Sequence, residues 1–230
     1  LKFIFTQCYY AHGPLSRMTL GEDKLQGIDY TYTILGWLKG INHASLQASN
    51  DPGADNTVNR YAPDAFGMQL NYFRGDFQRS GSPFSVGVVT ALNPAENHDL
   101  YNGNISTWTS QTVPNPAGLD LQYEQLTGNQ YRYDELNRIK RADFKYYDQN
   151  GWQATEDYNT SYTYDANGNI LSLNRNGYGA QALEMDRMRY NYLPETNQLS
   201  HVDDPVATTN YTEDIDEQAP NNYASDAIGQ

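Results

Sequence analysis

The feature that most constrains how this chain can fold is a short motif, Tyr-x-Tyr followed by turn-forming residues, which recurs along the sequence. Copies begin at Tyr131, Tyr162 and Tyr190, and a fourth, in which Ser225 stands in place of the second tyrosine, begins at Tyr223. Successive copies start 31, 28 and 33 residues apart, and an earlier relative begins at Tyr30. Self-similarity with a period of about 30 residues is the signature of a repeat architecture.

Each copy encodes one β-hairpin. Tyrosines at positions i and i+2 of a strand lie on the same face. The aspartate that follows them, Asp134 or Asp165, can accept hydrogen bonds from backbone N–H groups two residues on and so start a turn. Asn137 and Gly168 then supply the positive φ that closes it. The residues that define the repeats are Tyr30, Tyr32, Gly36, Trp37, Tyr131, Tyr133, Asp134, Asn137, Tyr162, Tyr164, Asp165, Gly168, Tyr190, Tyr192, Asn197, Tyr223, Asp226 and Gly229.

A lone hairpin is marginally stable in water, so each repeat has to be covered by the next. The composition suits such an array, with 20 Tyr against 7 Phe, 18 Gly, 23 Asn and a mean hydropathy of -0.77. Tyrosine packs its ring while its hydroxyl stays hydrated or hydrogen-bonded. We therefore predict an all-β fold: serial antiparallel β-hairpin repeats that form part of a curved sheet or hollow β-shell, with irregular loop insertions.

Residues 1–230 are predicted to be a fragment of one repeat domain, because the chain opens on a strand-like run and ends within a repeat. Its irregular stretches suit a repeat scaffold, in which insertions map to one surface. In order, we expect repeat-like hairpins at 1–42, a loop insertion at 43–63, divergent hairpins at 64–110, a Pro/Asn/Gly-rich loop at 111–122, the repeats proper at 123–202, an acidic exposed loop at 203–222 and the start of a truncated repeat at 223–230.

The net charge of -13 argues against a nucleic-acid partner, which attracts basic proteins. No Lys or Arg follows Arg189, and the acidic stretch beyond it is expected to be solvated. A calcium site there is the alternative, although no D-x-D-x-D-G loop is present. The single cysteine, Cys8, is expected to be a buried free thiol. No apolar run reaches the roughly 18 residues of a membrane span.

The sequence offers no recognisable catalytic, cofactor or metal site. The histidines at 12, 43, 98 and 201 are scattered, without metal-ligand spacing. No phosphate loop, dinucleotide fingerprint or nucleophile elbow occurs. Trp37, Trp108 and Trp152 could line a sugar-binding surface, but packing is the simpler role. We predict that the chain is not an enzyme and has no cofactor; a hydrolase with an unrecognised site is the least favoured alternative.

The pattern Tyr-x-Tyr-Asp-x-x-Gly/Asn-x-Ile/Leu resembles the YD repeats of Rhs proteins, of the teneurin shell and of the shell subunits of insecticidal Tc toxins. Segments 10–17, 26–42 and 66–77, with the Gly36–Asn42 run GWLKGIN, resemble stretches of Rhs proteins of the Bacteroidetes. The resemblance covers residues 8–110 and 123–230 in pieces. One motif copy is weak evidence, and four in order together with the GWLKGIN run are specific.

The resemblance implies a wide spiral of hairpins that closes into a hollow shell. In the bacterial members the shell encloses a C-terminal toxin or effector domain, and in the animal members the architecture serves cell-surface adhesion. The family's self-cleaving segment contains an Asp-Pro pair, but neither Asp51-Pro52 nor Asp204-Pro205 has a matching context, so that activity is not carried over.

We accordingly expect a structural wall segment of a secreted or cell-surface bacterial protein of the polymorphic-toxin kind, without a signal peptide in these residues. The expected partners are the remaining repeats of the parent chain, an enclosed C-terminal effector domain and secretion machinery, which in Bacteroidetes would be of type IX. The alternative is a cell-surface adhesion or carbohydrate-binding module that uses exposed aromatic residues.

Overall fold

The computed structural model describes residues 5–21, 24–77, 99–113, 125–178, 182–207, 209–211 and 215–225. In these residues the chain is almost wholly β-structure, with 13 strands and one short 3-10 helix, η1 (Ala48–Asn50). The strands are β1 (Phe5–Tyr9), β2 (Leu15–Leu20), β3 (Gln26–Tyr32), β4 (Leu38–Ile41), β5 (Phe66–Asn71), β6 (Thr107–Thr112), β7 (Thr127–Tyr133), β8 (Ile139–Asp148), β9 (Gly151–Ala154), β10 (Thr160–Tyr164), β11 (Ile170–Asn176), β12 (Glu184–Tyr192) and β13 (Leu199–Asp203).

The strands pair in chain order, β1-β2-β3-β4-β5-β6-β7-β8-β10-β11-β12-β13, with β9 paired to β8 off this path. The strand registers are antiparallel, from the β1–β2 pair through to the β12–β13 pair. Sequential antiparallel pairing is what a series of locally encoded hairpins produces. The predicted all-β fold of serial antiparallel hairpins is therefore confirmed.

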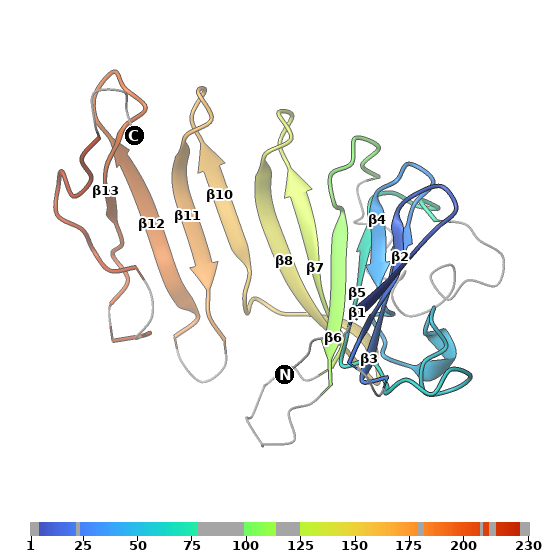
Figure 1. Cartoon of the computed structure of the whole chain (residues 1–230). Helices are drawn as coiled ribbons and strands as arrows, with labels where there is room; N and C mark the ends of the chain where they lie inside the picture. The colour runs from blue at the N-terminus through green and yellow to red at the C-terminus, as the bar shows by residue number, and fades with distance from the viewer. Residues whose placement is uncertain are drawn as a thin grey trace. The chain divides into compact units, whose positions relative to one another are not determined.

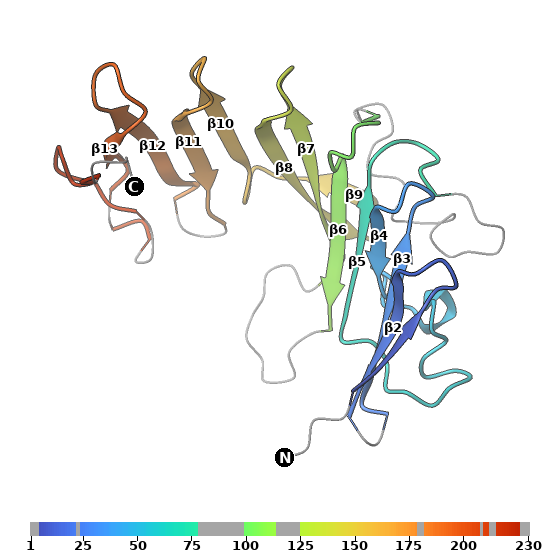
Figure 2. The same ribbon diagram turned by 45° about the horizontal axis from the view of Figure 1, so that its top comes forward.

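By its contacts the chain divides into two compact units. The first unit comprises Leu1–Gln130 and Lys145–Ala154, and the second comprises Tyr131–Phe144 and Thr155–Gln230. In the second unit β10, β11, β12 and β13 lie side by side, with the β10–β11 and β12–β13 turns at the same end (Figures 1 and 2).

Several hairpins share one turn geometry, from which the β12–β13 hairpin departs, because Tyr192 pairs with the residue seven positions later. Tyr9, Tyr32 and Tyr164 each end a first strand, pair with the residue six positions later and follow a register shift by one residue. In four turns, the residue that follows the last tyrosine of the first strand donates its N–H to the carbonyl of the residue four positions later. The residue three positions after this donor has positive φ. The donor–acceptor pairs are Tyr10–Pro14, Thr33–Trp37, Asp134–Arg138 and Asp165–Asn169, and the positive-φ residues are Gly13, Gly36, Asn137 and Gly168.

The buried positions are mostly polar. Among the described residues, eight hydrophobic residues are buried, against nineteen polar or charged ones. Lys39 in β4 is 2% exposed and donates 2.7 Å hydrogen bonds to Asn71 Oδ1 and Asp76 Oδ1. Buried polar groups are tolerated when they are paired in this way. A sheet whose covered positions carry so many hydrogen-bonded groups fits the chain's low hydropathy.

One residue, Cys8, departs from the sequence-based expectation, and three others cannot be compared with it. Cys8 is exposed on β1 rather than buried, because its strand has a neighbour on only one side in the sheet order. His98, Asp226 and Gly229 lie outside the described residues, so the expected repeat start at 223–230 is described only at its first residues. Within the described part of the chain, no helix is long and apolar enough to cross a membrane.

Candidate functional site

Two repeat turns of the second unit are closed by hydrogen bonds to an aspartate. Asp134 Oδ1 accepts the N–H of Leu136 at 3.0 Å and that of Arg138 at 2.9 Å. Asp165 Oδ1 does the same for the N–H groups of Asn167 and Asn169, at 2.9 and 2.8 Å. Hydrogen bonds to the charged form lower the pKa of both aspartates, chiefly the bond from the Arg138 N–H to Asp134 and the bond from the Asn169 side chain to Asp165. The aspartate of the motif is thus the turn-forming residue.

The second tyrosine of the motif links each hairpin to the one before it. Tyr164 donates its hydroxyl to the carbonyl of Ile139 at 2.7 Å, and Tyr192 donates to the carbonyl of Ile170 at 2.8 Å. In both cases the acceptor is the first residue of the second strand of the preceding hairpin. The rings of Tyr162 and Tyr164 stack with their centroids 6.4 Å apart, as expected for residues on one strand face. The motif therefore encodes contacts between repeats as well as the hairpin itself.

The first unit uses the same tyrosine link once. Tyr72, which follows β5, donates its hydroxyl at 2.8 Å to the carbonyl of Leu38, the first residue of β4. Tyr72 also packs against Trp37, with ring centroids 4.9 Å apart. Trp37 in turn lies close to Gly103, whose φ of 90° suits glycine.

The turn tips of the second unit also contact one another. Arg138 places its guanidinium 4.5 Å from the Tyr164 ring centre and donates to the carbonyl of Asp165 at 3.0 Å. Asn197, in the β12–β13 turn, accepts from the side-chain amides of Asn167 at 3.1 Å and Asn169 at 2.8 Å. A row of polar contacts therefore joins three successive turns.

The remaining repeat-defining residues lie as follows. Tyr30 and Tyr32 are half-buried on β3, and Thr33 takes the place of the motif aspartate, its hydroxyl accepting the N–H of Trp37 at 3.1 Å. Tyr190 lies within β12, and its hydroxyl contacts Met188 Sδ at 3.7 Å. Tyr131 and Tyr133 lie two positions apart at the end of β7.

Residues 215–223, expected as part of an exposed loop and of the next repeat, run along β13. Gln218 N–H donates to Val202 O at 3.1 Å, and Tyr223 N–H donates to Ser200 O at 3.1 Å. Gln218 Oε1 accepts the N–H of Val202 at 3.0 Å. Most of this segment's side chains are exposed, while its backbone pairs with the β13 edge that faces away from β12.

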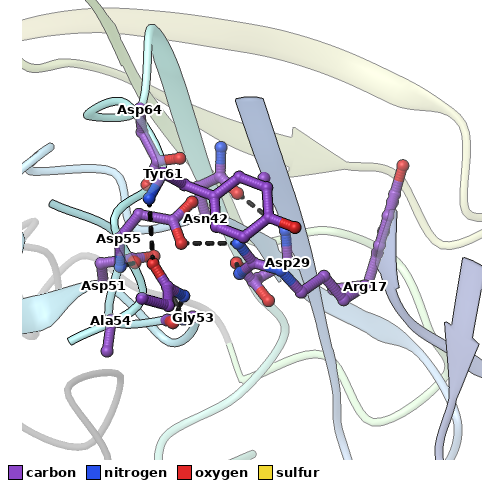
Figure 3. Close-up of polar contacts among 12 residues, drawn as sticks. Arg17, Asp29, Asn42, Asp51, Gly53, Ala54, Asp55, Tyr61 and Asp64 are labelled. Carbon is purple, nitrogen blue, oxygen red and sulfur yellow. Dashed lines mark hydrogen bonds and ion pairs between the residues drawn. The ribbon is translucent and has the colours of Figure 1, made fainter. Parts of the chain in front are cut away.

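A second feature, four aspartates around one arginine, lies in the first unit (Figure 3). Arg17 is on β2 and Asp29 is on the buried face of β3. Asp51, Asp55 and Asp64 come from the segment between η1 and β5. That segment turns back on itself through residues with positive φ, at positions 54, 56 and 60. We call these four carboxyls and Arg17 the acidic cluster.

Arg17 is the counterion of the cluster. Its Nη1 pairs with Asp29 Oδ2, and its Nη2 pairs with Asp55 Oδ1 at 2.5 Å. The Tyr61 ring centre lies 4.7 Å from the guanidinium carbon. A Cβ added at Gly27 would collide with Arg17 and Asp55. The guanidinium therefore fits only because β3 has no side chain at this point.

Backbone and side-chain groups fix the remaining carboxyls. Asp51 accepts the N–H of Gly53 at 3.3 Å and the N–H of Asp55 at 2.5 Å. Gln26 Nε2 donates to Asp64 Oδ1 at 3.2 Å. Asp64 also forms a hydrogen bond with Asp51.

Burial raises the pKa of two members of the cluster. Burial, and then the charge of and hydrogen bond to Asp51, raise the pKa of Asp64 to about 8. Burial raises the pKa of Asp29 to about 6, against the opposing effect of Arg17. Burial is the first cause of both shifts, and the charges of neighbouring aspartates add to it.

The arrangement suits a hard cation. Asp29, Asp51 and Asp55 each place a carboxylate oxygen within 4.8 Å of the others. Asp29 and Asp55 are 6% and 2% exposed. Carboxylate oxygens are the ligands that Ca²⁺ and Mg²⁺ prefer.

Sequence reasoning did not find this cluster. Its members are spread over 48 positions, from Arg17 to Asp64, without metal-ligand spacing. The sequence places Asp51 in the predicted loop at 43–63 and in an Asp-Pro pair, whereas the calcium alternative falls in the acidic stretch near the C-terminal end of the sequence. The one local signal was a loop that combines Asp51, Gly53 and Asp55, because close acids beside glycine often form turns that present oxygen ligands.

In comparisons with known proteins, no family model matches the chain and no curated protein matches it. Solved structures of Tc toxin proteins are similar to it. The crystal structure of TcdB2-TccC3-Cdc42 is 14% identical over 91% of this chain and 8% of that chain, with a TM-score of 0.47. The crystal structure of TcdB2-TccC3 without its hypervariable C-terminal region is 13% identical, again over 91% and 8%, with a TM-score of 0.46. The Photorhabdus luminescens Tc holotoxin pore is 9% identical over 89% of this chain and 10% of that chain, with a TM-score of 0.22. The chain thus spans about a tenth or less of these proteins' length.

Proposed function

We propose that this chain is a structural wall segment of a β-shell in a toxin-like protein of the Rhs kind, whose shell encloses or carries a C-terminal effector domain. In this proposal the chain has no catalytic role of its own. Its partners are neighbouring repeats and the enclosed domain. The parent protein would be secreted or displayed on the surface of a bacterium, and the secretion machinery would be a further partner.

The observation that carries the proposal is the repeated link between hairpins. Tyr164 and Tyr192 each bond a carbonyl of the preceding hairpin, 28 residues apart in the sequence. A contact that recurs at the repeat period joins any number of hairpins into one sheet. Such a sheet extends in one direction without needing a central core, which is what a wall requires.

The polar character of the buried residues supports the same role. A compact enzyme domain of this length is usually organised around an apolar core. Here the main apolar cluster is small: Ala44 and Leu126 are packed against Tyr147 and Trp152. Stability has to come chiefly from ladder hydrogen bonds, aromatic contacts and paired charges distributed along the sheet.

Electron microscopy of the complete gene product tests the proposal. We expect particles with a lumen, and we expect an enclosed domain to resist added protease until the shell is opened. The double variant Tyr164→Phe, Tyr192→Phe should loosen the wall and shorten this protection, while Tyr9→Phe, which removes an exposed hydroxyl bonded to Gln7, should leave it unchanged. Solid particles without a lumen would contradict the shell.

A carbohydrate-binding role is the second candidate, and Trp108 is the observation that favours it. Trp108 on β6 is 37% exposed, whereas Trp152 packs against Tyr147 with ring centroids 5.5 Å apart. Exposed aromatic rings are suited to stacking on sugars. Glycan-array binding that Trp108→Ala abolishes and Trp152→Phe retains would favour this role over the wall. An array without signal would remove it.

A further inference from the structure

We propose that the acidic cluster is a calcium site in which Asp29, Asp51 and Asp55 bind one Ca²⁺ and tie the loop after η1 to β3. The proposal is independent of the wall function, because it concerns a site within the first unit. The three ligands come from two segments that are separated in sequence by more than twenty residues. A bound ion would therefore hold a long irregular excursion against a strand.

The spacing of the oxygens matches one ion. Two oxygens bound to the same Ca²⁺ at about 2.4 Å cannot be more than about 4.8 Å apart. One carboxylate oxygen from each of the three aspartates meets that limit with respect to both others. Asp29 points from the buried face of β3, while Asp51 and Asp55 face it from the loop (Figure 3).

An orphaned oxygen indicates a ligand independently of the clustering. Asp55 is 2% exposed, and its Oδ1 pairs with Arg17. Its Oδ2 is buried without a hydrogen-bond partner among the described residues. A buried carboxylate oxygen left unpaired is unfavourable, because it has lost its hydrogen bonds to water without gaining a partner. A cation at this oxygen would be such a partner.

The basic residues near the acidic cluster do not pair with all of its carboxylates. Of the three proposed ligands, Arg17 forms ion pairs with two, Asp29 and Asp55. Lys24, the other cation at this place, lies 5.4 Å from the centre of the Tyr61 ring and donates to the Asn59 carbonyl. Asp51 has no ion pair among the described residues. A divalent ion supplies the charge that these partners do not.

Burial favours Ca²⁺ over Mg²⁺. Mg²⁺ requires a near-octahedral shell at 2.0–2.1 Å and usually keeps several waters. Ca²⁺ accepts irregular sets of carboxylate and carbonyl oxygens. Two of the three aspartates here are almost fully covered, and the third is fixed by backbone N–H groups of its own loop, so an ion would have to use protein oxygens.

The test measures thermal unfolding of the full chain, after treatment with chelator, against added Ca²⁺ or Mg²⁺, together with Tb³⁺ luminescence excited through tyrosine. The variant is Asp51→Asn, which leaves both ion pairs of Arg17 in place. The matched control is Asp216→Asn, the same change of charge at an exposed position.

We expect Ca²⁺ to raise the Tm of the parent and of Asp216→Asn, and to displace Tb³⁺ from both. In Asp51→Asn the Ca²⁺ affinity should fall by about tenfold or more, because even outer-shell substitutions cost 10–100-fold. No Ca²⁺ effect on the parent, an effect that Asp51→Asn retains in full, or an equal response to Mg²⁺ would overturn the proposal.

Discussion

The repeat hairpins of the second unit and the acidic cluster of the first unit are stabilised in opposite ways. In the β10–β11 hairpin the turn is specified within six positions, from Tyr164 to Ile170. In the cluster the partners of Arg17 lie 12 and 38 residues away. One region is built from local rules repeated in series, and the other depends on a single assembly of distant charges.

This difference indicates how much stability each region should lose when a single residue is replaced. A repeat turn is also stabilised by the turns beside it, because hydrogen bonds of Arg138, Asn169 and Asn197 connect three turns. A distributed set of weak contacts loses little when one is removed. The cluster has one arginine for several buried carboxyls, so the loss of that residue leaves charges without a counterion.

The largest effect is expected from removing the counterion. In chelator, Arg17→Met should lower the free energy of unfolding by about 3–5 kcal/mol, because Asp29 and Asp55 become unpaired buried charges. Arg138→Met, in a repeat turn, should cost about 1 kcal/mol or less, because its ion pair with Asp134 is partly exposed. Urea titrations of both variants measure the contrast. Equal costs would show that the cluster is no more dependent on one residue than a turn is.

A pH-dependent effect should distinguish the cluster from the turns. The pKa of Asp64 is about 8 in the folded protein, against 3.8 when unfolded, so the folded state holds an extra proton between these values. The stability that this proton gives is complete below pH 4 and is lost as the pH rises through 8. Asp64→Asn keeps a neutral donor beside Asp51, so in chelator the variant should gain stability relative to the parent over this range.

Asp165→Asn is the matched control for that pH series. Its folded pKa is lowered by hydrogen bonds to the turn amides, so its contribution is present above the unfolded pKa and is lost as the pH falls. Denaturation curves at pH 5, 7 and 9 should therefore show no gain for Asp165→Asn as the pH rises. A parent and an Asp64→Asn variant with parallel pH profiles would contradict the raised pKa of Asp64.

The sequence was sufficient for the hairpins because their determinants are local. The turn-forming role of Asp165 and the positive φ of Gly168 follow from residue chemistry alone. The link from Tyr192 to Ile170 could not be foreseen, because it depends on how adjacent hairpins are staggered. The acidic cluster was missed for the same reason, since nothing in the sequence near Arg17 indicates that Asp55 will lie beside it. Local rules predict elements, and the contacts between elements need the fold.

A smaller effect is expected at a turn that needs positive φ. Gly168→Ala should cost about 1–2 kcal/mol, because an L-residue with Cβ is strained at a φ of 94°. Space is not limiting, because the nearest heavy atom to an added Cβ is 4.0 Å away. Gly168→Asn should cost less, since Asn137 occupies the equivalent position of the preceding turn with a φ of 63°. Chemical denaturation compares the two, and a cost for Asn that equals the cost for Ala would argue against backbone strain as the cause.

The smallest effect concerns the link between hairpins. Tyr192→Phe removes one hydroxyl and keeps the ring, so the free energy of unfolding should fall by about 1 kcal/mol, the usual net value of one hydrogen bond. Tyr9→Phe, whose hydroxyl is exposed and bonds only locally to Gln7, should be neutral. Hydrogen exchange should then show faster opening along β11 and β12 in the first variant but not in the second. If Tyr192→Phe changes nothing, the repeats are joined by their strand ladders and turn contacts alone, and the tyrosine of the motif contributes through its ring.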